Sequence, residues 1–373
     1  MKLSPIRKIL SVVNPETAHN IALRRLRAIG AVPAGKWFLG KRYAERSPML
    51  EREVFGMKFP NPVGVAAGYD CNGEAIEELA AAGFGFVEIG TVTPRPQAGN
   101  PRPRLFRMPS AGAMLDRTGY PSKGLEYVMG RVRNRRRGII VGCNIGKNTI
   151  TPDHAATGDY LKVFRNMYQY VDYFSINVCC NTSSKVYVPT SKDAISELLA
   201  PLFEFRRGQS DYRPILIKIS PDLSTEQLDQ VVDALVELPL DGIVAVAGTL
   251  SRDGLTSAER AYADSKGAGA ISGAPLTRRA IETVAYIHRR SGGFYPIIGS
   301  GGMMSPEDVR DMLAAGASLV QLNTGIIYHG IGLAGKICRW LTAAAKAEQS
   351  AAAGNKASGT AAESEQPSQK ERS

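Results

Sequence analysis

Two glycine-rich loops in the last third of the chain have the composition of a phosphate-binding site. The first is GSGG at residues 299–302, which follows the apolar run PII, and the second is NTG at 323–325, which follows SLVQL. Glycines let backbone N–H groups approach a phosphate closely, and a following helix terminus adds a favourable field. The alternative is that these are ordinary turn glycines. Both apolar runs are followed by such a loop, and this repetition favours a phosphate site. The site would include Gly301, Gly302, Asn323 and Thr324.

Lysines and asparagines lie at the ends of other apolar runs. Lys218 lies inside the run PILIKIS, and Lys147 follows GCNIG. A buried ammonium without a partner is costly, so Lys218 is a candidate to contact a bound anion or an electron-rich cofactor ring. Asn144 and Asn177 end two further runs, where their amides could fix a heterocycle by hydrogen bonds or, equally, act as loop caps.

Two adjacent cysteines, Cys179 and Cys180, follow the run YFSINV. They cannot form an ordinary metal site by themselves, and no histidine has a matching spacing, so we expect no metal. A thiol in this place, with an unperturbed pKa of ~8.5, could serve as a proton-transferring base. The alternative, a small buried hydrophobe, fits Cys179 as well as the functional reading does and fits Cys180 less well.

Eight short apolar runs, bounded by turn residues, predict the strands that would position these groups. They are continuous rather than alternating, as is typical of parallel strands buried on both faces, and helix-like segments lie between them. This pattern predicts an α/β fold, a closed (β/α)₈ TIM barrel, whose chemistry sits on the loops after the strands. An open doubly wound sheet would leave strands over and would want a GxGxxG motif after the first strand, which is absent. The predicted strands are 62–67, 85–90, 138–144, 173–178, 214–220, 241–247, 296–300 and 318–322.

The two ends of the chain differ from the barrel region at 46–343. Residues 1–45 have no strand signal, and the segment NPETAHNIALRRLRAIG predicts a helix with Asn14 as its cap and Pro15 at its first position. Two interpretations of this helical element stay open: it packs on the barrel, or it lies as an amphipathic element on an anionic membrane surface. Residues 344–373 are rich in Ala, Ser, Glu, Gln and Lys, which predicts a disordered tail.

The composition excludes several classes of protein. The net charge of +11 would attract nucleic acid, anionic lipid or anionic substrates, but no zinc-ligand spacing, RNP-like pattern or helix-turn-helix signal favours nucleic acid. Five cysteines without framework-like spacing indicate a reducing compartment. The N-terminus has no apolar core long enough for a signal peptide, and no stretch approaches the ~20 apolar residues that span a bilayer.

Several motifs together resemble the dihydroorotate dehydrogenases of the membrane-associated, quinone-using class. The resemblance runs from about residue 6 to about residue 341, and its most specific stretch is GTVTPRPQAGNPRPRLFR at 90–107. The helical N-terminus before the barrel is similar to this class rather than to the soluble classes. The other matching stretches are NPVGVAAGYD, NIGKN, IKISPDLS, ISGAPL, IIGSGG and AAGASLVQL.

The resemblance implies a cofactor, a reaction and a location. A base would take a proton from C5 of dihydroorotate while C6 gives a hydride to FMN, and a quinone that arrives through the N-terminal helices would reoxidise the flavin. The protein would then lie peripherally on the cytoplasmic side of the inner (cell) membrane. The implied FMN-binding residues are Ala67, Gly68, Thr91, Asn144, Asn177, Lys218, Gly273, Gly301, Gly302 and Thr324, with Asn323 in the second phosphate loop.

The substrate side departs from the family pattern at four places. Cys71 replaces a lysine, and the segment DRTGYPS at 116–122 replaces NRxGFNN, so that Asp116 stands where the family has an orotate-binding asparagine. The catalytic loop SSPNT becomes CCNT at 179–182, which makes Cys180 the candidate base, and TNT becomes VAG at 246–248. An ionised Asp116 would repel a carboxylated substrate unless it were protonated or turned away. The implied substrate-binding residues are Cys71, Asp116, Asn177 and Asn181.

Three functions are therefore compatible with the sequence. The first is a divergent dihydroorotate dehydrogenase, the second is an FMN oxidoreductase on the same scaffold with another small substrate, and the third is a catalytically silent flavin-binding or membrane-surface protein. Each lost hydrogen bond to a charged group is worth ~1.5–3 kcal/mol, so the departures affect dihydroorotate more than the flavin.

Overall fold

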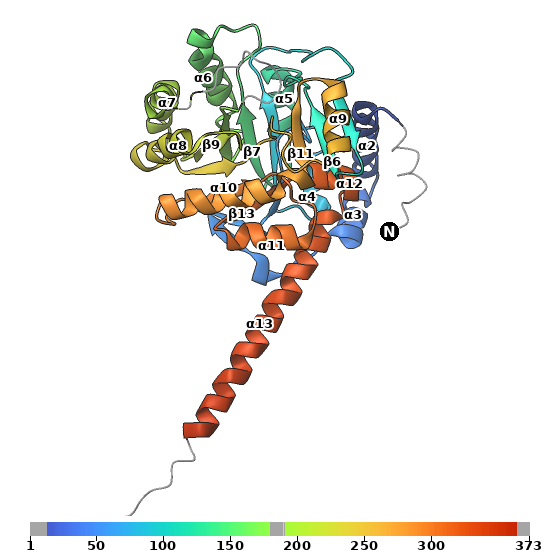
Figure 1. Ribbon diagram of the computed structural model, residues 1–373, viewed down its shortest axis with the longest axis vertical. Coiled ribbons are helices and arrows are strands. Elements are labelled where there is room, and N and C mark those ends of the chain that lie inside the picture. Colours follow the sequence, from blue (N-terminus) through green and yellow to red (C-terminus); the bar gives the residue numbers. More distant parts are fainter. Residues whose placement is uncertain (1–12, 180–188, 190, 364–373) are drawn as a thin grey trace, which may run out of the picture.

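A closed barrel of eight parallel strands forms the centre of the protein (Figure 1). The computed structural model describes residues 13–179, 189 and 191–363. Each barrel strand pairs with the barrel strands that precede and follow it along the chain. The last barrel strand pairs with the first, which closes the ring. Each strand overlaps one of the eight predicted runs, so the predicted (β/α)₈ TIM barrel is confirmed. The strands are β3 (Val63–Val65), β4 (Phe86–Val92), β7 (Ile140–Ile145), β8 (Tyr173–Asn177), β9 (Ile215–Ile219), β10 (Gly242–Ala245), β12 (Ile297–Ser300) and β13 (Leu319–Leu322).

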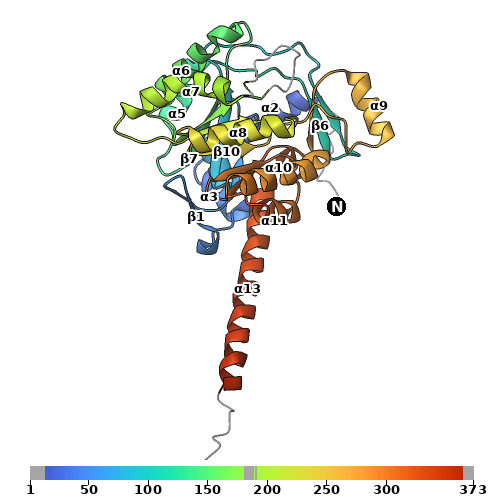
Figure 2. The ribbon, with the colours of Figure 1, turned by 60° about the vertical axis from the view of Figure 1, so that its left-hand side comes forward.

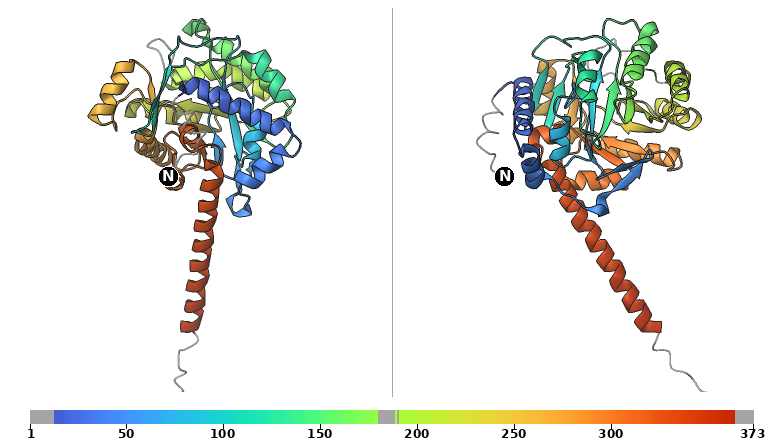
Figure 3. Two further views of the ribbon diagram at one scale, coloured as in Figure 1. Left: turned by 90° about the vertical axis from the view of Figure 1, so that its right-hand side faces the viewer. Right: turned by 180° about the vertical axis from the view of Figure 1, so that it is seen from behind.

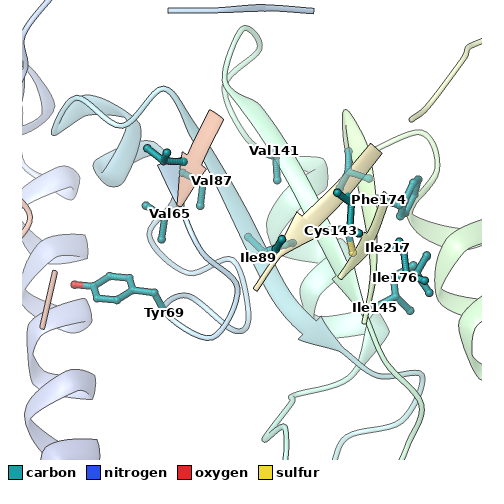
Figure 4. Close-up of a cluster of buried hydrophobic side chains, with 14 of the residues drawn as sticks. Val65, Tyr69, Val87, Ile89, Val141, Cys143, Ile145, Phe174, Ile176 and Ile217 are labelled. Atoms are coloured by element: carbon teal, nitrogen blue, oxygen red, sulfur yellow. The ribbon is translucent and has the colours of Figure 1, made fainter. Parts of the chain in front are cut away.

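Helices follow the strands and cover the outside of the barrel (Figure 2). Serine side chains cap several of them, as at α8, where Ser224 and Gln227 form a capping box. Outward-facing strand side chains such as Val87, Ile176 and Ile217 pack under these helices in one large apolar cluster (Figure 4). The helices are α4 (Ile76–Ala81), α5 (Leu125–Arg133), α6 (Ala156–Met167), α7 (Lys192–Arg207), α8 (Thr225–Glu237), α10 (Thr277–Arg290), α11 (Pro306–Ala314) and α12 (Thr324–His329); 3₁₀ turns lie at η1 (Pro48–Leu50), η2 (Asp153–Ala155) and η3 (Ala274–Leu276).

Apolar side chains close the N-terminal end of the barrel. The hairpin of β1 (Arg52–Val54) and β2 (Met57–Phe59) adds its own apolar residues to those that point inward from the barrel strands. Gly64 and Gly142 make room for two of the rings, because a Cβ at these positions would lie 2.4 Å from Phe86 and 2.1 Å from Tyr173. The cluster consists of Val54, Phe59, Phe86, Tyr173, Leu216, Val244, Ile298 and Leu319.

A second sheet lies beside the opposite, C-terminal end of the barrel. It is antiparallel and has the order β11 (Ala270–Gly273), β6 (Ala113–Asp116) and β5 (Leu105–Met108), with α9 (Ser257–Lys266) next to it. This sheet was not predicted from the sequence. Its strands contain polar residues such as Arg107, Asp116 and Ser272, so they lack the continuous apolar runs that identify the barrel strands.

Two helices precede the barrel and lie against its side (Figure 3). The first, α2 (Pro15–Ala31), begins as predicted, since Asn14 accepts hydrogen bonds from the N–H groups of residues 16 and 17. The second is α3 (Gly35–Tyr43). Buried residues of both helices, Leu23, Leu26 and Leu39, belong to the main apolar cluster.

The last helix, α13 (Leu333–Glu363), differs from the expectation of a disordered tail from residue 344. Its first turns pack against the barrel, and the rest continues as a single helix that projects away from it (Figures 1 and 3). The reason is helix propensity: the segment is rich in Ala, Glu, Gln and Lys, which favour a helix even where no apolar face is buried. The expectation of disorder rested on the lack of large apolar residues in this segment and did not include its helix propensity.

Candidate active site

A cavity of about 720 Å³ opens at the C-terminal ends of the barrel strands. Its walls come from the loops after the strands, from the three-stranded sheet and from α2. The predicted site residues that line it are Ala67, Gly68, Cys71, Thr91, Asp116, Asn177, Lys218, Gly301, Gly302, Asn323 and Thr324. The fold thus brings together residues that are up to 257 positions apart in the sequence.

A hydrogen-bonded cluster of three polar side chains forms one part of the cavity floor. The Thr91 hydroxyl donates to Oδ1 of Asn144 at 2.7 Å, and Nδ2 of Asn177 donates to Thr91 Oγ1 at 3.1 Å and to Asn144 Oδ1 at 3.2 Å. Asn144 is fully buried behind the other two, so it supports the cavity wall without lining it. The main-chain N–H of Cys179 donates to Asn177 Oδ1 at 3.0 Å, which fixes the orientation of that amide.

Lys218 has the partner that its apolar surroundings require. Its ammonium lies 3.6 Å from Oε1 of Glu88, a fully buried carboxylate that points into the barrel from β4. Glu88 also accepts hydrogen bonds from Gln321 Nε2 at 2.7 Å, Tyr173 OH at 3.1 Å and Asn144 Nδ2 at 3.4 Å. A polar layer of side chains thus lies between the apolar floor of the barrel and the cavity.

Glu88 was not among the predicted site residues, although the sequence contains a signal for it. A glutamate in the apolar run GFVEIG is as anomalous as a lysine in PILIKIS, and two buried groups of opposite charge satisfy each other. Lys147, the other lysine considered, does not line the cavity: its ammonium donates to the Thr151 carbonyl at 2.8 Å and lies 3.2 Å from Asp153.

The glycine-rich loops have the backbone geometry of a close approach. Gly301 and Gly302 have φ angles of +97° and +78°, and a Cβ on Gly302 would lie 2.4 Å from the Cα of Thr277. The Thr277 hydroxyl donates to the Gly302 carbonyl at 2.7 Å. Gly273, with φ +98°, packs against Thr324 from the second sheet. A Cβ on Gly325 would lie 2.4 Å from the Met303 carbonyl oxygen, so the two loops lie side by side at the edge of the cavity.

The substrate-side departures gather at the wall formed by the second sheet and the loop after β3. Asp116 ends β6, and its Oδ1 accepts the N–H of Thr118 at 2.7 Å. Burial raises the pKa of Asp116, while that hydrogen bond and the nearby Arg104 oppose the rise. Burial, together with the carboxylates of Asp70 and Asp116, raises the pKa of the Cys71 thiol to about 12. Cys71 is therefore a neutral side chain in the place of a lysine.

The catalytic loop is only partly within the described residues. Cys179 is buried, and its thiol donates to the main-chain carbonyl of Lys218 at 3.0 Å, so it has a packing role. Cys180 and Asn181, the predicted base and one predicted substrate ligand, lie outside the described residues. The segment Val246, Ala247 and Gly248 lines the cavity, where the family pattern has TNT.

Helix α2 is held over one side of the cavity by an ion-pair cluster. Glu16 lies 2.6 Å from Arg104 and 2.9 Å from Arg102, both in the segment before β5. Burial alone would raise the pKa of Glu16, but the hydrogen bonds from the two arginines lower it. Further along the helix, His19 stacks edge-on against Tyr69 with ring centres 5.0 Å apart, and burial lowers the pKa of His19. This end of the cavity is therefore lined by the ion-pair cluster of Glu16, by the imidazole of His19, whose lowered pKa favours the neutral form, and by the apolar side chain of Leu23.

Comparisons with known proteins agree with this geometry. The family model for dihydroorotate dehydrogenase matches residues 49–344. A dihydroorotate dehydrogenase (quinone) from Christiangramia forsetii is 39% identical over 333 residues, which cover 89% of this chain and 96% of that protein. One from Thermosynechococcus vestitus is 45% identical over 312 residues, 82% of this chain and 84% of that protein.

A solved structure is similar to this chain over most of its length. The dihydroorotate dehydrogenase of Eimeria tenella in complex with ferulenol superposes with a TM-score of 0.77 and 29% identity, over 87% of this chain and 89% of that one. The two chains thus share their fold over most of their length. From the family match over most of its length, and from relatives at about two-fifths identity, this chain belongs to the dihydroorotate dehydrogenase family.

Proposed function

We propose that the protein oxidises dihydroorotate to orotate, with FMN as its cofactor and a quinone as the electron acceptor. The names of its relatives support both the substrate and the acceptor. The observation that carries the proposal is the cavity itself, where Lys218, the cluster of Thr91 and Asn177, and the two glycine-rich loops face one another.

The lining residues fit a flavin mononucleotide. The main chain of Gly301 and Gly302 lines the cavity at positive φ angles, which suits main-chain N–H groups that hold a phosphate. The carboxamide oxygen of Gln321 is buried at the cavity and has no hydrogen-bond partner among the described residues, so it can accept a hydrogen bond from a ring N–H. Lys218 would hold the ring by its positive charge, and Ala67, Gly68 and Thr91 would pack against it. When bound, FMN would supply a hydride acceptor for C6 of the substrate.

The substrate would lie between the flavin region and the wall that carries Cys71 and Asp116. Asn177 and Asn181 would hydrogen-bond to the dihydropyrimidine ring. Cys180 would take the proton from C5 as its thiolate; cysteine in general has a pKa of ~8.5, so a fraction on the order of a few per cent is in this form at neutral pH unless the site lowers the pKa.

The quinone would enter along α2 and α3, and these helices would lie on the membrane. Trp37 and Phe38 of α3 are 64% and 58% exposed, and Ile29 and Val32 are exposed nearby. The Lys41 ammonium lies 5.1 Å from the Trp37 ring centre, so cationic and aromatic groups share this surface. Such a surface suits a peripheral contact with anionic lipid, on the cytoplasmic side of the inner membrane. Within the described residues, no helix has the length and apolar character needed to cross a bilayer.

Anaerobic mixing of the FMN-loaded protein with dihydroorotate tests this proposal. The visible flavin absorbance should fall, and a soluble quinone should restore it. Cys180→Ala should slow the reduction by about 10²–10⁴, the usual contribution of a general base, whereas Cys338→Ala, a buried cysteine of α13 away from the cavity, should not.

The unfavourable outcomes point to different corrections. A flavin that stays oxidised with dihydroorotate but bleaches with another small reductant would mean a different substrate. Retention of flavin without reduction by any dihydropyrimidine would favour a silent flavin-binding protein, and a protein that cannot be loaded with FMN would overturn the proposal at the cofactor.

A further inference from the structure

Asp116 occupies a defined position on the cavity wall. It ends the central strand of the second sheet, paired with Ala270 on one side and Leu105 on the other. The N–H of Thr118 donates to its Oδ1 at 2.7 Å, and the Thr118 side chain also hydrogen-bonds to the carboxyl group, which fixes its orientation. Asp116 and Cys71 both line the cavity.

The cations near Asp116 are bound to other groups. Arg104 donates to Glu16 at 2.6 Å and to the carbonyl groups of residues 98 and 100. Arg117, the next residue along the chain, donates to the carbonyl groups of Lys266 and Pro103. Within the parts of the chain that the structure describes, no ion pair to Asp116 is found. The remaining titratable groups that face it are the Glu16 carboxylate from α2 and the neutral Cys71 thiol from the loop after β3.

An ionised Asp116 would therefore face an anionic substrate without an ion-pair partner of its own, since the nearby Arg104 is already paired with Glu16. Two carboxylates in contact repel each other, and the interaction is strong where water is excluded. A neutral carboxyl group removes the repulsion. It also has the hydrogen-bonding pattern of an asparagine amide, with one donor and one acceptor on adjacent atoms. Burial already raises the pKa of this side chain before any ligand binds.

We propose that Asp116 binds the substrate as a neutral carboxylic acid, donating its Oδ2–H to an oxygen of dihydroorotate or orotate while Oδ1 accepts from Thr118. This inference rests on the proposed function. Binding of the anionic ligand takes up one proton, which comes from solvent and stays on Asp116. Aspartate at the position where the family pattern has asparagine then still allows the ligand to bind. It also makes the affinity for the ligand depend on pH.

Orotate binding measures this directly, because the product binds without turnover. Orotate is titrated into the oxidised holoenzyme from about pH 5.5 to about pH 8.5, and the perturbation of the visible flavin spectrum gives the Kd. In the wild type, the Kd should rise about tenfold per pH unit above the pKa of Asp116, by linkage. In Asp116→Asn it should be nearly constant, and at the upper pH it should be at least about tenfold lower than in the wild type.

A control and a second measurement keep the test independent of the variant. Asp253→Asn, at an exposed loop residue away from the cavity, should reproduce the wild-type profile. Calorimetric titration of the wild type in two buffers of different ionisation enthalpy should give an uptake of about one proton per orotate at neutral pH, even if Asp116→Asn folds poorly.

The outcomes separate this inference from the proposed function. Orotate affinity that is independent of pH in the wild type, with no proton uptake, would overturn the role of Asp116 and leave the activity standing. Absence of orotate binding in both the wild type and Asp116→Asn, with the flavin retained, would overturn the proposed substrate and the inference with it.

Discussion

The ion pair of Glu88 and Lys218 allows a sharp prediction of stability. Glu88→Gln keeps the shape of the side chain and removes its charge, which leaves the Lys218 ammonium buried and unpaired. Breaking a buried pair by removing one partner costs about 3–5 kcal/mol. The amide also offers one acceptor oxygen where the carboxylate accepts from Gln321, Tyr173 and Asn144. We therefore expect the free energy of unfolding to fall by about 3–5 kcal/mol.

The partner variant separates charge from hydrogen bonding. Lys218→Met removes the cation but leaves Glu88 with three hydrogen-bond donors, so its loss should be smaller. The double variant Glu88→Gln/Lys218→Met has no buried charge, and it should be more stable than Glu88→Gln alone. Residues in one network have coupling free energies of about 0.5–3 kcal/mol, and we expect a value in this range.

Urea unfolding followed by far-UV circular dichroism measures these differences. The samples should be free of flavin, so that a changed flavin affinity does not alter the apparent stability. Glu53→Gln, at an exposed position of the β1 strand, is the matched control and should change the free energy by no more than about 0.5 kcal/mol. A loss for Glu88→Gln no larger than that of the control would refute the reasoning.

Three further changes test the ion-pair cluster, the phosphate loop and the membrane surface. Arg104 holds the pKa of Glu16 low, so their ion pair stabilises the fold above the unfolded-state pKa of Glu16. This stabilisation is lost as the pH falls through the folded-state pKa. Amide exchange in α2 should therefore become faster in acid for the wild type and be faster at all pH values for Glu16→Gln. Gly302→Ala, where φ is +78° and a Cβ would meet main-chain atoms, should weaken FMN binding measured by absorbance titration, whereas Gly138→Ala, at φ +85° in open space, should affect only stability, by about 1–2 kcal/mol. Trp37→Ser should reduce co-sedimentation with anionic vesicles several-fold and leave orotate binding unchanged, and equal sedimentation would argue against membrane contact through α3.

The barrel could be predicted from the sequence because its strands are buried on both faces. Each produces a run of apolar residues, such as those at 140–145 or 215–219, that turns interrupt at regular intervals. The loops that follow such strands meet at one end of the barrel, so residues as distant as Ala67 and Thr324 could be assigned to one site.

The remaining features depend on tertiary contacts that local patterns do not encode. The second sheet consists of four-residue strands, and Ala270 and Asp116 become neighbours only because three separate segments pair over the barrel end. Lys218 was recognised as anomalous, but its partner Glu88 lies on a strand 130 positions earlier in the chain. The helix that continues to Glu363 owes its form to residue propensity rather than to burial, and the apolar pattern on which the prediction relied does not report on it.

The apolar plug of the barrel has a consequence for proton traffic. The hairpin β1–β2 and the rings of Phe59, Phe86 and Tyr173 close the N-terminal end, so the polar layer above them has no contact with solvent from below. Among the described residues, Glu88 is fully buried and Lys218 lines the cavity, so the cavity is the side from which water and protons approach this pair. A ligand that fills the cavity blocks this approach of solvent. While the ligand is bound, the protonation states of the buried groups beneath it therefore stay constant. Only groups on the cavity wall can then exchange protons with solvent.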